Sequence, residues 1–294
     1  MSAIATHSVT PGKAALPTSL SDEALARESM LAQAAIRRHR FVIIGLRIAV
    51  LVTVLGGWEL AADRKWIDPF FYSQPSLIWA QIVDWIRNGT SQGSLWMQVA
   101  VTLEETILGF LIGGVSGIIA GILLGRNKLL SDIFSLYIQI ANSVPRVVLG
   151  SVFVIALGLG MASKVALAVV MVFFVVFGNA FQGVREADKY LIANARILGA
   201  SPRQLTTSVV IPSAMSWILA SLHVSFGFAL VGAVVGEFLG AKQGMGLLIS
   251  TAQGAFNASG VFAAMIVLAV VALVADFLLT RLETRLLKWR PTVF

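Results

Sequence analysis

Long apolar runs alternate with short polar stretches along this chain, a pattern typical of a protein that crosses a membrane several times. A membrane-spanning helix needs about 20 consecutive, mainly apolar residues. The segments that meet this requirement are 42–61, 98–124, 138–158, 164–184, 213–236 and 261–280. Pro145 and Arg146 interrupt the third of them. The pattern predicts an all-α, polytopic membrane protein with six transmembrane helices.

Charge is distributed unequally over the polar stretches. With the N-terminus inside, most of the 22 lysines and arginines fall in the tail, in the loops after the second and fourth spans, and after the last span. Cytoplasmic loops of membrane proteins carry such an excess. We therefore expect both termini in the cytoplasm, with a tail over 1–40, a transmembrane domain over 41–290 and a C-terminal end over 291–294.

Composition changes this picture little. The chain is 57% hydrophobic, and its net charge of +7 is explained by positively charged cytoplasmic loops without any nucleic-acid partner. There is no cysteine, no Gly-x4-Gly-Lys-Ser/Thr phosphate loop and no His-Glu-x-x-His metal motif in the sequence. We expect no catalytic residue, metal or cofactor in this chain.

The outer side of the predicted protein has two structured segments. Within 63–97, an apolar residue recurs at helical spacing from Leu77 to Ile86, which predicts a helix on the membrane surface. Within 237–259, glycines provide the expected turn points, and they are Gly240, Gly244 and Gly246.

A glycine recurs every fourth residue in the second span, at Gly109, Gly113, Gly117, Gly121 and Gly125. On a helix these positions form one stripe without side chains, which allows another helix backbone to approach closely. Two roles fit this stripe: tight packing inside the subunit, or a moving or subunit-joining contact.

Ionisable residues at membrane depth are costly and call for an explanation. Arg146 follows the helix breaker Pro145, so we place Arg146, with Asn142 and Ser143, on a solute path that favours an anion. The alternative is that the third span starts at Pro145 and Arg146 marks its cytoplasmic border. We expect the carboxylates of Glu104 and Glu105 to lie at the outer membrane–water interface. The alternative is that one of them faces a cavity. We expect Asp276 near the cytoplasmic end of the last span, satisfied by Arg281 or a backbone amide.

The polar stretch from Glu186 to Pro212 predicts two short helices joined by a sharp turn. Leu191, Ala195 and Leu198 share one face of the first helix. Gly199 is placed to end that helix, and after Ala200 the second helix begins at Ser201-Pro202 with a capping box to Gln204. A plain connector needs no such length. We interpret the hairpin as a docking element for a cytoplasmic partner.

The same stretch resembles the "EAA" loop of ABC-importer permeases. That pattern is Glu-Ala-Ala, three residues, Gly, nine residues, then Ile-x-Leu-Pro. The matching residues here are Ala193-Asn194-Ala195, Gly199 and Val209-Val210-Ile211-Pro212. Ala193 departs from the pattern, because it replaces the glutamate.

Weaker similarities to the nitrate/sulfonate/taurine branch of that family extend over 41–290. They are Pro75-Ser76-x-Ile78, Gly109-Phe110, Gly158-x-Gly160, Gly236-Glu237, Gly244-x-Gly246-x-Leu248, Asp276 and Leu287-x-Trp289-Arg290. The resemblance implies a type I importer permease in the inner membrane of a bacterium. It implies two permease copies, two ATPases that hold ATP and Mg²⁺ and dock on the hairpins, and a periplasmic or lipid-anchored binding protein.

The expected coupling residues are therefore Leu191, Ala193, Asn194, Ala195, Leu198, Gly199, Ala200, Ser201, Pro202 and Pro212. Glu237 joins Arg146 on the expected solute path. Nitrate, sulfonates, taurine and aromatic carboxylates fit such a path, and neutral pyrimidines remain compatible with it. The competing hypothesis is an ion-coupled secondary transporter, in which Glu104, Glu105 and Asp276 would serve the coupling ion.

Overall fold

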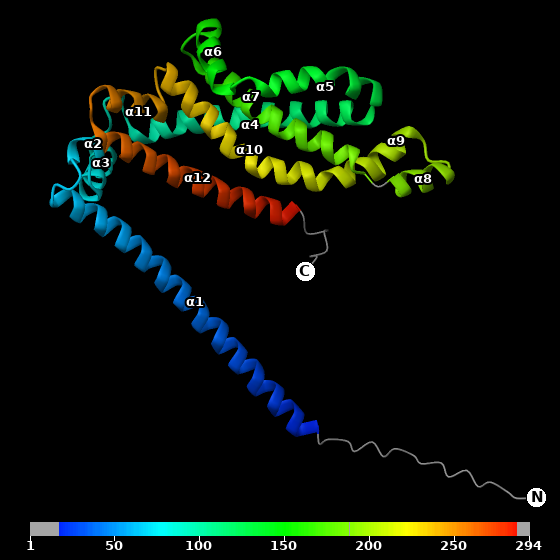
Figure 1. The fold of residues 1–294 in the computed structure, drawn as a ribbon, viewed down its shortest axis with the longest axis horizontal. Coiled ribbons are helices and arrows are strands. Elements are labelled where there is room, and N and C mark those ends of the chain that lie inside the picture. Colours follow the sequence, from blue (N-terminus) through cyan, green and yellow to red (C-terminus); the bar gives the residue numbers. More distant parts are fainter. Residues whose placement is uncertain (1–17, 188, 287–294) are drawn as a thin grey trace, which may run out of the picture. The chain divides into compact units, whose positions relative to one another are not determined.

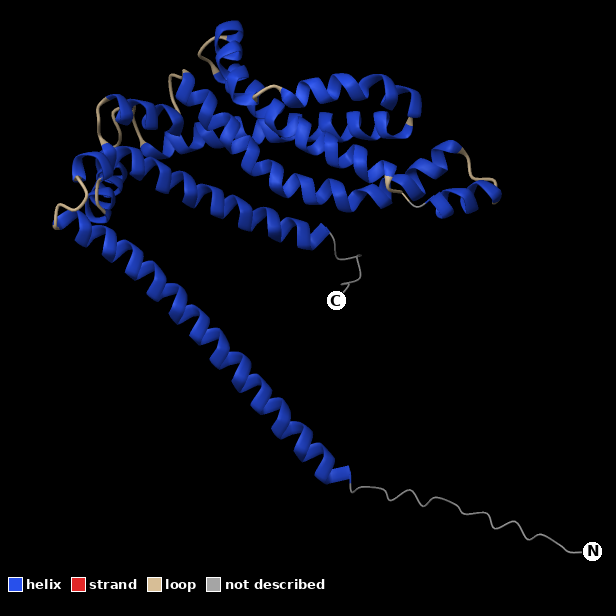
Figure 2. Cartoon of the chain, viewed as in Figure 1, coloured by secondary structure: helices blue, strands red, loops and turns tan. Residues whose placement is uncertain are grey.

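The structure is a computed structural model that describes residues 18–187 and 189–286. Nearly all of this backbone is helical (Figure 2). The predicted C-terminal end 291–294 and the first part of the predicted tail lie outside the described residues. The helices are α1 (Thr18–Asp63), α2 (Pro69–Tyr72), α3 (Pro75–Asn88), α4 (Leu95–Arg126), α5 (Lys128–Ser143), α6 (Leu149–Leu157), α7 (Met161–Arg185), α8 (Lys189–Ile197), α9 (Pro202–Leu205), α10 (Ile211–Leu239), α11 (Met245–Gly254) and α12 (Ala258–Leu286).

The chain divides into two compact units, Met1–Arg64 and Lys65–Phe294. The described part of the first unit is the single helix α1, so the predicted first span continues without a break from the second half of the predicted tail. All other helices belong to the second unit.

Within the described residues, five helical segments are long and apolar enough to cross a membrane, and they are Arg37–Asp63, Leu95–Arg126, Met161–Arg185, Pro202–Leu239 and Ala258–Arg281. A bent pair, Lys128–Ala141 with Arg146–Leu157, brings the total to six if it is counted as one span. The prediction of an all-helical membrane protein with six spans is confirmed on that count.

The third span differs from the continuous helix expected over 138–158. Its two halves meet at an angle of 73°. Pro145 has no N–H to donate, and its ring disfavours helical geometry at the preceding residue. Val144 accordingly has extended dihedral angles, φ −75° and ψ 126°, and the chain becomes helical again only at Arg146.

Helices α4, α7 and α10 form the core of the second unit and run along one another (Figure 1). The glycine stripe of α4 is buried against α7: a Cβ atom added to Gly117 would lie 2.9 Å from the carbonyl oxygen of Phe173. The other stripe glycines face α7 in the same way, Gly109 at Ala168, Gly113 at Val172, Gly121 at Ala180 and Gly125 at Val184. The stripe therefore serves tight packing within the subunit, the first of its two expected roles.

Helices α2, α3 and α11 lie at the end of the core opposite the hairpin (Figure 1). The predicted surface helix is α3, which buries Ile78, Ile82 and Trp85 and packs against α12. Two of the predicted turn points are present, because Gly240 directly follows the end of α10 and Gly244 directly precedes α11. The third, Gly246, lies in the first turn of α11.

Candidate functional site

The hairpin between α7 and α10 has the local structure that its sequence predicts. Helix α8 ends at Ile197, and Gly199 follows it with a φ of +83°, a left-handed conformation that favours glycine. The N–H groups of Gly199 and Ala200 donate to the carbonyl oxygens of Arg196 and Ala195, each at 3.0 Å, and so close the end of the helix.

The second helix of the hairpin begins with the predicted capping box. Ser201 Oγ accepts from the N–H of Gln204 at 3.3 Å, and Gln204 Oε1 accepts from the N–H of Ser201 at 2.8 Å. Pro202 occupies the first helical position, where an N–H has no partner in the helix. The two caps together define the turn from Gly199 to Pro202.

Helix α9 continues into α10 through a π-helical turn over Thr206–Val210. Pro212 cannot donate to the carbonyl of Ser208, and its ring crowds that carbonyl, so the helix widens by one residue before it. The N–H of Ile211 accordingly donates to Thr206, five residues earlier. The hairpin is thus joined to α10 through continuous helical backbone.

One face of the hairpin is an open, mostly apolar groove of about 570 Å³. It is lined by Leu191, Asn194, Ala195, Leu198, Ser208, Val209, Pro212 and Ser213. Leu198 is 87% exposed although it is a large apolar residue. The structure therefore brings together Leu191, Asn194, Ala195, Leu198 and Pro212 from the expected coupling set, while Ala193 is exposed outside the groove.

A second cluster of polar residues is buried where α4 and α10 meet the loop before α11. The carboxylate of Glu237 is fully buried, and both its oxygens accept hydrogen bonds: Oε1 from Thr102 Oγ1 at 2.7 Å and Oε2 from the N–H of Gly246 at 2.6 Å. This corrects the expected placement of Glu237 on a solute path, because the side chain lies in packed interior and holds helices together.

The N–H groups of Gly244, Met245 and Gly246, at the start of α11, find partners in this cluster. The N–H of Gly244 donates to Gln98 Oε1 at 2.7 Å, and the N–H of Met245 donates to Thr102 Oγ1 at 2.9 Å. Side-chain oxygens thus replace the helical partners that a first turn lacks. A Cβ atom on Gly244 would collide with the Glu237 carboxylate, so the turn requires glycine there.

Glu105 and Lys164 belong to the same buried region. Lys164 is 1% exposed, and its Nζ donates to the carbonyl oxygens of Leu159 at 2.7 Å and Gly160 at 3.1 Å. Glu105 is 3% exposed, and its Oε2 has no hydrogen-bond partner among the described residues. Glu105 is therefore buried within the protein, although Glu104 beside it is exposed.

The sequence pattern does not predict most of this buried polar cluster. The family resemblance includes Gly236-Glu237 and Gly244-x-Gly246. No motif in the sequence singles out Gln98 or Thr102. Lys164 stands at the first position of the apolar run 164–184, and nothing in that pattern indicates its burial. Only the packing of α4, α7 and α10 brings these residues together.

The break in the third span positions Arg146 beside α7. Its guanidinium lies over the ring of Phe174, 5.1 Å from the ring centre. Ser143 Oγ donates to the carbonyl oxygen of Gln139 at 2.9 Å, so this hydroxyl is held by its own helix. Asn142 lies in the same helix, α5.

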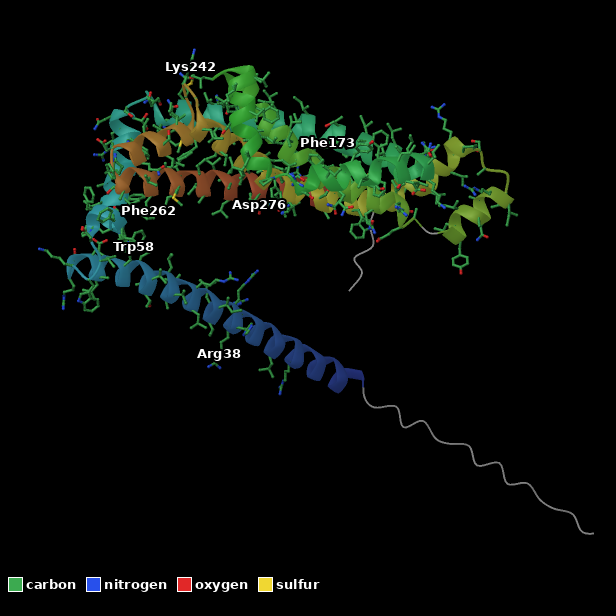
Figure 3. The ribbon with its side chains drawn as sticks, turned by 45° about the horizontal axis from the view of Figure 1, so that its top comes forward. Arg38, Trp58, Phe173, Lys242, Phe262 and Asp276 are labelled. Atoms are coloured by element: carbon green, nitrogen blue, oxygen red, sulfur yellow. The ribbon has the colours of Figure 1, made fainter. Side chains whose placement is uncertain are left out.

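Asp276 has a partner that the sequence did not indicate. Its Oδ1 lies 3.1 Å from His223 Nε2, which connects α12 to α10. Figure 3 labels Asp276 in the C-terminal part of α12. The pair connects the core helix α10 to α12, and both helices are candidate membrane spans.

Known proteins resemble this chain over most of its length. A profile of the family described as "binding-protein-dependent transport system inner membrane component" matches residues 113–288. The putative aliphatic sulfonates transport permease protein SsuC of Bacillus subtilis is 33% identical over 67% of this chain and 72% of its own. The taurine transport system permease protein TauC of Escherichia coli is 27% identical, covering 85% of this chain and 91% of its own.

Other relatives are named for different solutes. The formylaminopyrimidine transport permease protein ThiX of Halalkalibacterium halodurans is 27% identical over 79% of this chain and 91% of its own. Among solved structures, an inward-facing MetNI methionine ABC transporter matches with a TM-score of 0.57 at 20% identity. That match covers 65% of this chain and 96% of the other, and it shows a common fold.

Proposed function

Because the chain belongs to the family of binding-protein-dependent transport system inner membrane components, we propose that it forms half of the membrane path of an ABC importer in a bacterial inner membrane. A permease subunit of this family is a transport component and does no covalent chemistry. Two cytoplasmic ATPases would bind ATP and Mg²⁺ and hydrolyse the ATP. A second copy of the chain would complete the path, and a periplasmic or lipid-anchored binding protein would deliver the solute.

The observation that carries the proposal is the exposed groove of the hairpin. Leu191 and Leu198 are large apolar side chains on its surface, 53% and 87% exposed, beside the rigid turn at Gly199. An apolar groove on a capped helix is a suitable contact for a partner protein. The ATPase would dock here, and the continuous helix from α9 into α10 would carry its movement to the spans. The spans would then alternate between inward-open and outward-open states.

Substitution of Leu198 by Asp tests this docking. A charge in the centre of an apolar contact removes burial and leaves a carboxylate without a partner, so ATPase co-purification should fall by roughly tenfold or more. Ile197→Asp is the matched control, because Ile197 is 82% exposed but does not line the groove. Equal retention of the ATPase by both variants, at normal membrane expression, would refute the groove as the docking site.

For the solute we propose a small anion of the sulfonate class. Support comes from Arg146, a cation at the break between two half-spans, and from the similarity to the sulfonate permease SsuC and the taurine permease TauC. Backbone that interrupts a span is tolerated where it lines a cavity, and such breaks often mark the solute site. Arg146, with Asn142 and Ser143 just before the break, would line the path.

A further inference from the structure

A second cavity, of about 750 Å³, lies between the hairpin and the adjoining ends of α4 and α7. Three arginines line it, and each comes from a different helix: Arg126 from α4, Arg185 from α7 and Arg196 from α8. We call it the arginine cavity. It shares no lining residue with the docking groove, which uses other positions of α8.

Among the described residues that line the arginine cavity, every charged side chain is positive. Each of the three arginines lies in the last turn of its helix, where the free carbonyl oxygens stabilise a cation without a carboxylate partner. Among the described residues that line the cavity there is no carboxylate. The guanidinium of Arg185 is also held in place by the ring of Phe181, at 5.5 Å from the ring centre, and by Ser131. The cavity is therefore electrostatically suited to an anion.

The floor of the cavity is apolar. Val184, Ala187 and Leu205 all line it and are all buried in the chain, at 6%, 4% and 8% exposure. A free inorganic anion would gain nothing from such a floor. A molecule with an anionic head and an apolar body would use both parts of the site, and the volume lies in the range that encloses a whole small molecule.

The position of the arginine cavity favours one class of such molecules. The cavity lies at the ends of two membrane spans, α4 and α7, where the headgroup layer of a bilayer meets the protein. Basic pockets between transmembrane helices on the cytoplasmic side bind anionic lipid headgroups. We propose that the arginine cavity binds the phosphate of an anionic phospholipid, which thereby ties the hairpin to α4 and α7. The cytoplasmic position of the cavity rests on the proposed function; the binding chemistry does not.

The test is lipid binding by the full chain, purified in detergent without its partners. Fluorescent phosphatidylglycerol should bind at least tenfold more tightly than fluorescent phosphatidylcholine. An arginine near an anionic lipid surface contributes about a fivefold gain in affinity, so the triple change Arg126→Gln, Arg185→Gln and Arg196→Gln should weaken phosphatidylglycerol binding by about a hundredfold.

Two control variants separate binding from folding. Arg203→Gln removes an exposed arginine of α9 that does not line the cavity, and its affinity should equal that of the wild type. The triple Arg→Lys variant keeps the charges and should retain most of the binding. Equal affinity for both lipids, or wild-type binding by the triple Gln variant, would overturn the proposal. Complete displacement of the lipid by millimolar inorganic phosphate would overturn the assignment to a lipid.

Because no ATPase is present, this result is independent of docking. Loss of ATPase binding in Leu198→Asp with unchanged lipid selectivity would leave both proposals intact. A chain that fails to bind any ATPase but selects phosphatidylglycerol would overturn the proposed function alone.

Discussion

Glu237 is the residue that connects the helices at the end of the core opposite the hairpin. Its two carboxylate oxygens connect α10 to Thr102 of α4 and to Gly246 at the start of α11. Thr102 in turn accepts from the N–H of Met245, so three helices, α4, α10 and α11, meet in one hydrogen-bonded unit. Buried networks of this kind stabilise strongly when every member has a partner, and removal of one member leaves the others unsatisfied.

Glu237→Gln should therefore destabilise the chain by about 2–3 kcal/mol. The amide keeps one acceptor but turns an N–H₂ group toward the N–H of Gly246 or the hydroxyl of Thr102, which puts two donors together. Unfolding in mixed micelles measures the effect. Glu104→Gln, an exposed position on α4, should change stability by less than about 0.5 kcal/mol. Equal stability of the two variants would show that the network contributes nothing.

Arg146 is the residue that bears on solute choice. Arg146→Gln removes a charged hydrogen-bond donor from the proposed path, so the apparent affinity for an alkyl sulfonate in uptake should fall about tenfold. Arg87→Gln, which removes an exposed arginine of α3, serves as the control. Unchanged sulfonate uptake by Arg146→Gln, at normal assembly, would exclude Arg146 from the path.

At the scale of elements, the contact between α4 and α7 is built on backbone rather than on side chains. Gly117 faces the carbonyl oxygen of Phe173 and the N–H of Phe177, so there is no space for even one methyl group. Close approach through small residues is how helices associate inside a bilayer, where burial from water contributes little.

Gly117→Ala should accordingly destabilise the chain by about 1–3 kcal/mol through overpacking. Gly178→Ala on α7 is the matched control, since its added Cβ would have nothing within 4 Å in the described structure. Thermal unfolding of both variants in the same detergent gives the comparison. If Gly117→Ala is no less stable than Gly178→Ala, the close contact is not the source of stability.

What the sequence predicted well is local. The turn at Gly199 and the capping box at Ser201 depend on neighbouring residues alone, and both are present. The burial of Glu105 and Lys164 depends on which helices pack together, and hydropathy along the chain contains no such information. The 73° break was signalled by Pro145, but the path of the chain after it was not.

At the scale of the whole molecule, the two ends of the helical core have different properties. At one end of the core, buried hydrogen bonds fix α4, α10 and α11 to one another. At the other, a capped hairpin presents an open apolar groove and a cavity lined by arginines. A fixed end and an exposed end suit a subunit that receives movement from a partner. The competing hypothesis, an ion-coupled transporter, would instead place its coupling ion at carboxylates such as Glu105.

Uptake into proteoliposomes distinguishes these hypotheses most directly. The purified permease, assembled with its ATPase, is reconstituted with ATP inside, and the binding protein with labelled alkyl sulfonate is added outside. We predict that the labelled sulfonate accumulates only when ATP is present, and that accumulation persists when protonophores collapse the proton gradient. Accumulation should be lost in Leu198→Asp but not in Ile197→Asp. Accumulation driven by a proton or sodium gradient without ATP would contradict this prediction.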